Sequence, residues 1–164
     1  IVICALLLSL GACSLSGNNT KFTIGVLDSV VVLDPLFADN SSEKIVASNC
    51  FEGLLRFDGE GKIDLAGATA YTTDKTALKY TFKLNPDAVW FVSDGAATLM
   101  ESSGLTDFDA RITADDYIHG IERFVLNSDD ELLAIKGAFD YQNGKTEKIA
   151  GLKAVDDFTL EITL

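Results

Sequence analysis

The stretch ALKYTFKLN, residues 77–85, carries the clearest secondary-structure signal in the chain. Apolar side chains occupy every second position from Leu78 through Tyr80 and Phe82 to Leu84, and lysine or threonine occupies the positions between them. Side chains of a strand point alternately to the two faces of a sheet, so this pattern predicts a strand with one buried and one solvated face. We therefore expect these four apolar side chains to face the core.

The neighbouring segments predict a mixed α/β fold. Further strands are expected at 21–28 and 158–164, and a hairpin is expected around the DGEG turn at 58–61. Helices are expected at 41–53, capped by Ser41 or Ser42, at 113–127, and from about 130 to the Asn143-Gly144 pair. Residues 85–87, NPD, predict a turn, and residues 96–112 are expected to form a loop.

Residues 1–12, IVICALLLSLGA, are uncharged. They are too few for a transmembrane helix, which takes about 20 residues, and they fit the apolar part of a secretory signal peptide. The following cysteine completes Leu10-Gly11-Ala12-Cys13, which resembles the bacterial lipobox, where cleavage precedes a cysteine that carries diacylglycerol. We predict a signal peptide over 1–12, a lipidated Cys13 and flexible tether over 13–21, and a folded body over 22–164. The alternative is a buried strand or helix that ends in Cys13.

The overall charge disfavours one class of partner. The chain has 13 basic and 25 acidic side chains, a formal net charge of -12, and such a surface repels a phosphate backbone, so we expect no nucleic acid. The chain starts at Ile1 without a methionine and ends inside the 158–164 pattern, so we expect it to be part of a longer protein. Uncovered strand edges and apolar faces are then expected, including the 158–164 strand.

Isolated reactive residues do not form a catalytic pattern. Cys50 is the one cysteine left in the predicted mature body, and it is expected to be buried as a small apolar side chain, as is Trp90. His119 is the single histidine, without partners at metal-binding spacing. No nucleophile motif or phosphate-binding loop occurs, so we expect no enzyme activity, no metal and no cofactor.

Six segments, taken in order, resemble the extracellular solute-binding proteins of family 5. They are LDP (33–35), NCFEGLLRFDGEGKI (49–63), KYTFKLNPDAVW (79–90), SDG (93–95), TADDYIHGIER (113–123) and GLKAVDDFTLEITL (151–164). This family comprises the oligopeptide-, dipeptide- and nickel-binding components of ABC importers. The resemblance implies a periplasmic-binding-protein-like fold (type II, cluster C), of which this chain would hold the first part of lobe I and the small extra domain.

The same resemblance implies where a ligand would lie. In oligopeptide binders the stretch after LDP lines the cleft and pairs with the extended ligand through its backbone. Gapless spacing places that stretch on Phe37, Asp39, Asn40, Ser41 and Ser42, with Asp39, Asn40 and Ser41 nearest the ligand. The alternative is that residues 39–42 only turn the chain and cap the next helix, and the two roles are compatible.

The function implied is that of a substrate-binding lipoprotein of an ABC importer. Its partners would be a peptide ligand, the permease subunits in the membrane, and the lipid bilayer through acylated Cys13, on the outer face of the cell membrane. Other cargoes remain open: a nickel chelate, an opine or an oligosaccharide. Two further alternatives are a surface receptor for peptide signals that does not transport and a lipid-anchored hydrolase.

Overall fold

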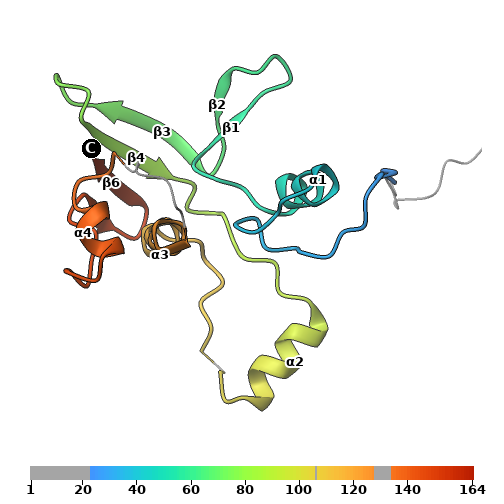
Figure 1. Ribbon diagram of the computed structural model, residues 1–164. Helices are drawn as coiled ribbons and strands as arrows, with labels where there is room; N and C mark the ends of the chain where they lie inside the picture. Colours follow the sequence, from blue (N-terminus) through green and yellow to red (C-terminus); the bar gives the residue numbers. More distant parts are fainter. Residues whose placement is uncertain (1–22, 106, 128–133) are drawn as a thin grey trace, which may run out of the picture.

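The computed structural model describes residues 23–105, 107–127 and 134–164. Its centre is a four-stranded antiparallel sheet in the order β3–β4–β6–β5, formed by Ala68–Thr73, Lys79–Leu84, Thr159–Thr163 and Leu152–Asp156. Helices α3 (Ala114–Asn127) and α4 (Ala138–Gln142) lie beside this sheet (Figure 1). The hairpin β1–β2 (Leu55–Phe57 and Ile63–Leu65) and helices α1 (Ser41–Cys50) and α2 (Asp94–Ser102) extend away from it.

Strand β4 is central because it pairs with β3 on one side and with β6 on the other. Phe82 and Leu84 are buried in the main core and Tyr80 packs against it, which confirms the predicted inward face at three positions. Leu78 is 52% exposed, so that part of the prediction is wrong. The strand begins one residue later, after a turn in which the Asp74 carboxylate accepts hydrogen bonds from the Leu78 and Lys79 amides.

Helix α3 closes the core over the sheet. At its start, the Asp116 carboxylate accepts hydrogen bonds from both the backbone N–H and the hydroxyl of Thr113, at 2.7 and 2.9 Å. Tyr117 and Ile118 pack against the cluster around Phe82, and Val125 lies in a second buried cluster. The helix predicted over 113–127 is thereby confirmed and packs one apolar face on the core, whereas Phe124 remains largely exposed.

Two predicted elements differ from the structure. Residues 23–28 are irregular instead of a strand, since no other strand of the described chain lies beside them to share hydrogen bonds. The loop expected over 96–112 contains most of α2 instead. Its start is capped by the Ser93 hydroxyl, which accepts from the Ala96 amide at 3.2 Å, and its alanine, leucine and methionine residues favour helix.

Other expectations are settled by burial and pairing. Strand β6 is hydrogen-bonded on both sides, so the expectation that the 158–164 strand would be uncovered is wrong. Cys50 and Trp90 are exposed instead of buried, because no other part of the described chain covers them. The hairpin at 58–61 and the turn at 85–87 are confirmed. Helix α4 is shorter than the predicted helix, and residues 128–133 of that prediction lie outside the described residues.

Within the described ranges, no helix combines the length and the apolar character needed to cross a membrane. The predicted signal peptide, Cys13 and the tether lie outside the described residues.

Gly151, directly before β5, makes a tight backbone contact with the end of β6 and with Lys136. Its amide donates to the Lys136 carbonyl at 2.7 Å, and its carbonyl accepts from the Thr163 amide at 2.7 Å. A Cβ at this position would overlap the Thr163 carbonyl oxygen and would lie 2.9 Å from that of Lys136. Both obstacles are backbone atoms, so they cannot rotate away.

Gly151→Ala should therefore lower the free energy of unfolding by about 1–3 kcal/mol, the usual cost of overpacking. Urea unfolding of the full-length protein measures this change. Gly120→Ala is the matched control, because a Cβ there meets nothing within 4 Å and the residue lies inside α3. The control should raise stability by about 0.5–1 kcal/mol. Equal effects of the two substitutions would contradict the contact.

Candidate functional site

The predicted ligand-contacting segment leads into helix α1. The first helical residue is Ser41, and Asn40 is the N-cap, with extended backbone angles of φ -85° and ψ 165°. The Asn40 side chain accepts from the Glu43 amide at 2.9 Å, and the Glu43 carboxylate accepts from the Asn40 amide at 3.4 Å. This reciprocal pair is a capping box, so the predicted cap at Ser41 or Ser42 is corrected to Asn40.

The carboxylate of Glu43 gathers amides from two separate stretches of backbone. Its Oε1 accepts from Val31 and Val32 at 3.1 and 3.0 Å, and its Oε2 accepts from Asp39 at 3.1 Å as well as from Asn40. The residue is only 4% exposed. The amides of Val32, Asp39 and Val31 lower the pKa of Glu43 to about 2, since each favours the charged form. One side chain therefore fixes the backbone on both sides of the LDP motif.

Arg123 of α3 contacts the same segment from the sheet side. Its Nη1 donates to Asp34 Oδ1 at 3.2 Å, and its Nη2 pairs with the other carboxylate oxygen of Asp34. Its guanidinium carbon also lies 5.7 Å from the centre of the Phe37 ring. The hydrogen bonds between the two side chains lower the pKa of Asp34 and raise the pKa of Arg123. Both groups are therefore charged together.

The structure places the predicted site residues in different environments. Phe37 is 51% exposed, and Asp39 and Ser41 are exposed too, with side chains that make no hydrogen bond within the described part of the chain. Ser42 is 2% exposed, and its hydroxyl accepts from the Asp28 amide at 2.9 Å. The capping interpretation is confirmed for Asn40. Contact of any of these residues with ligand stays a prediction.

The main-chain groups that this segment leaves available to a partner include the two that flank Asn40. The Asp39 and Asn40 amides are engaged by Glu43, whereas the Asp39 carbonyl and the Ser41 amide make no hydrogen bond within the described ranges. In a parallel strand pair, one residue bonds to the carbonyl and the amide that flank a single residue of its neighbour. The carbonyl and amide that flank Asn40 are spaced in this way, and Asn40 has extended backbone angles.

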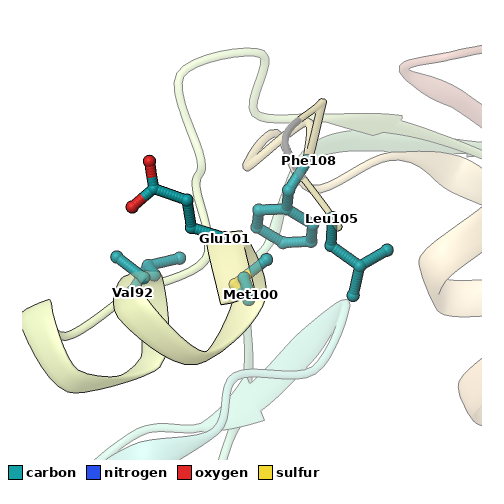
Figure 2. Close-up of a pocket in the computed structure, with 6 residues that line it drawn as sticks. Val92, Met100, Glu101, Leu105 and Phe108 are labelled. Atoms are coloured by element: carbon teal, nitrogen blue, oxygen red, sulfur yellow. The ribbon is translucent and has the colours of Figure 1, made fainter. Parts of the chain in front are cut away.

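A second concave region lies apart from this segment, where Leu105 and Phe108 face α2. It is an open cavity of about 390 Å³, lined by Val92, Ala97, Met100, Glu101, Leu105 and Phe108. Figure 2 shows the labelled side chains of Val92, Met100, Glu101, Leu105 and Phe108 around it. Its lining is mostly apolar and contains none of the predicted site residues. Across the described residues, no three His, Cys, Asp or Glu side chains gather as they would to hold a metal ion. Neither region offers a nucleophile paired with a base.

Two residues of this site went unassigned in the sequence. Glu43 does have a sequence signal, because the Asn-x-x-Glu spacing from Asn40 is itself typical of a capping box. Arg123 has no such signal. Its partner Asp34 lies 89 residues away, and no local pattern joins them.

Known proteins are similar to this chain in sequence and in fold. No protein-family model matches the chain. The oligopeptide-binding protein AmiA of Streptococcus pneumoniae is 30% identical over 166 residues, covering 94% of this chain and 24% of AmiA. The oligopeptide-binding protein SarA of Streptococcus gordonii is 31% identical over 171 residues, with the same two coverages.

A solved structure extends this likeness to three dimensions. OppA of Listeria monocytogenes, bound to peptide, matches with a TM-score of 0.60 and 30% identity over 84% of this chain and 26% of that one. The chain thus spans about a quarter of the length of the relatives it matches.

The position of Glu43 predicts an acid-dependent loss of stability. Its folded pKa of about 2 lies below the ordinary glutamate value of 4.5, so its contribution is present above pH 4.5 and is lost as the pH falls towards 2. Glu43→Gln should lower the melting temperature at neutral pH, because an amide group cannot accept from all four N–H donors. It should also flatten the fall in melting temperature between those two pH values.

The measurement is a series of thermal melts of the full-length protein from neutral to acid pH. Glu147→Gln is the matched control, since Glu147 is exposed and has no partner in the described part of the chain. Parallel pH curves for wild type and Glu43→Gln would show that Glu43 does not hold these amides.

Proposed function

Because this chain belongs to the extracellular solute-binding proteins that serve ABC importers as oligopeptide-binding components, we propose that the protein captures oligopeptides and delivers them to a membrane permease. The observation that carries this proposal is the pair of unengaged main-chain groups that flank Asn40. A second lobe, in the rest of the full-length protein, would close over the ligand from the other side.

In this mode the ligand adds to the segment as a short strand. The Asp39 carbonyl accepts from the N–H of one peptide residue, and the Ser41 amide donates to the carbonyl of the same residue. Main-chain bonds of this kind hold peptides of different sequence equally. Phe37 offers an exposed ring beside the ligand, and Ser42 binds Asp28 and so helps to fix the start of α1.

Transport then follows from differential binding alone. A ligand that contacts both lobes stabilises the closed form, because only that form touches it on two sides. The permease would recognise the closed form and receive the peptide. The role requires no covalent chemistry, so we assign no catalytic residue, no metal and no cofactor.

Membrane attachment is the second part of the proposal. Acylation of Cys13 would hold the protein on the outer face of the membrane, and residues 13–21 would tether the folded body to the lipid. This arrangement keeps the binding protein close to its permease, so the effective concentration of the binding protein at the permease is raised.

Peptide binding through the Ser41 amide can be tested by one substitution. Ser41→Pro removes this N–H at the first position of a helix, where proline is well tolerated, and Asn40 already has the extended backbone that must precede proline. We expect the melting temperature to be retained. The dissociation constant for peptides should rise roughly two- to tenfold, the effect of one lost hydrogen bond.

The assay is calorimetric titration of the refolded, ligand-free full-length protein with pooled di- to hexapeptides. Ser41→Ala is the matched control, since it removes the hydroxyl and keeps the amide, and its affinity should equal that of wild type. Peptide binding unaffected by proline would refute this mode. A rise in melting temperature with a nickel chelate, an opine or an oligosaccharide, and none with peptides, would refute the proposal that the cargo is an oligopeptide.

The lipid anchor predicts where the protein is found. Cys13→Ala in the native host should move the protein from the membrane fraction to the medium or periplasm and should abolish incorporation of labelled palmitate. Cys50→Ala is the matched control, because it removes the exposed thiol of the folded body and should leave the distribution unchanged. Retention of Cys13→Ala in the membrane fraction would exclude this anchor.

A further inference from the structure

We propose that Arg123 is a positioning residue for ligand binding, which holds the segment 37–42 in register with the sheet although it contacts no ligand itself. The proposal rests on the function proposed above and assigns a role to a residue outside the predicted site. Its basis is the arrangement of Arg123, Asp34 and Phe37.

The first observation is how few bonds join the segment to the rest of the protein. Among the described residues, the pair of Asp34 and Arg123 is the one hydrogen-bonded or ionic link between residues 23–50 and residues 57–164. Figure 1 shows α1 standing to one side of the sheet. The remaining polar contacts of Asp39, Asn40 and Glu43 stay within residues 23–50, since their partners outside the segment and α1 are Ser29, Val31 and Val32. These contacts give the segment its shape but do not fix its place.

The second observation is the geometry of the link. Both Nη atoms of Arg123 engage both carboxylate oxygens of Asp34, and such a two-point contact fixes orientation as well as distance. The same guanidinium lies over the Phe37 ring at 5.7 Å. Arg123 therefore contacts the chain at Asp34 and Phe37, three positions apart, and restrains rotation of the backbone between them.

The third observation is that Glu43 holds the other end of the same stretch of chain. Glu43 holds the amides of Asp39 and Asn40 from the helix side, so the two unengaged groups that flank Asn40 lie at the far end of a stretch that begins at Asp34. Without the contact at Asp34, this stretch would move relative to α3, and its hydrogen bonds to Glu43 would open more often. Ligand contacts shared with a second lobe would then be out of register, and small errors of position lower affinity.

The role can be separated from overall stability. The ion pair is partly exposed, with 43% of the Arg123 side chain and 30% of the Asp34 side chain accessible, and exposed pairs add little to the free energy of unfolding. Arg123→Gln should therefore leave the melting temperature close to wild type. Local order of the segment should change, which is a readout that a general structural role would not give.

The experiment measures hydrogen exchange and peptide affinity on the full-length protein. In the ligand-free state, Arg123→Gln should speed exchange at the amides held by Glu43, which are those of Val31, Val32, Asp39 and Asn40. The dissociation constant for peptides should rise about three- to tenfold. Arg123→Lys, which keeps the charge and loses the two-point contact, should lie between this variant and wild type.

Arg56→Gln is the matched control, because Arg56 also pairs with carboxylates at the surface, those of Glu52 and Asp64, away from the segment. Arg56→Gln should change neither the exchange of these amides nor the dissociation constant for peptides. The exchanged pair Asp34→Arg with Arg123→Asp should restore part of the affinity.

Unchanged exchange in Arg123→Gln would overturn the proposal, and so would faster exchange with unchanged peptide affinity. A wild-type protein that binds no peptide would instead overturn the proposed function. Exchange in the ligand-free protein would still decide whether Arg123 holds the segment.

Discussion

An extended backbone without a neighbouring strand must find acceptors for its amides, and Glu43 supplies them here. Residues 31–32 and 39–40 approach the start of α1 from two directions, and a single buried carboxylate accepts from all four amides. The burial of that charge is tolerated because the amides replace its hydration. The course of the chain before α1, and with it the candidate ligand-binding edge, depends on this side chain.

Two kinds of interaction stabilise the rest of the structure. Apolar packing stabilises the sheet, and polar contacts stabilise the segment before α1. The sheet and α3 form their core from apolar side chains such as Phe82 and Leu160. The segment before α1 contributes little to that core, and polar groups fix it instead, through Glu43 within the segment and Arg123 from outside. A binding edge needs exposed main-chain groups, so it cannot be built from a fully paired strand.

Local patterns in the sequence predicted the elements whose hydrogen bonds or periodicity depend on residues close by in the chain. The alternation around Phe82, the DGEG hairpin and the start of α3 at Thr113 all follow from periodicity or turn chemistry. Elements that depend on distant partners could not be predicted in this way. The strand expected at 21–28 lacks a neighbour in the described chain, and Cys50 and Trp90 are exposed for want of a covering element. The pairing of Asp34 with Arg123 crosses 89 residues without a sequence signal.

The free carbonyl and amide that flank Asn40 belong to the main chain, which every amino acid except proline supplies in the same form. In the binding mode proposed, evolution can therefore change the side chains at 39 and 41 without altering what the ligand meets. Divergent relatives would share a binding edge that leaves no mark at those positions in an aligned family. The trace of such a site lies instead in the residues that shape the backbone around it, of which the carboxylate at position 43 is the clearest.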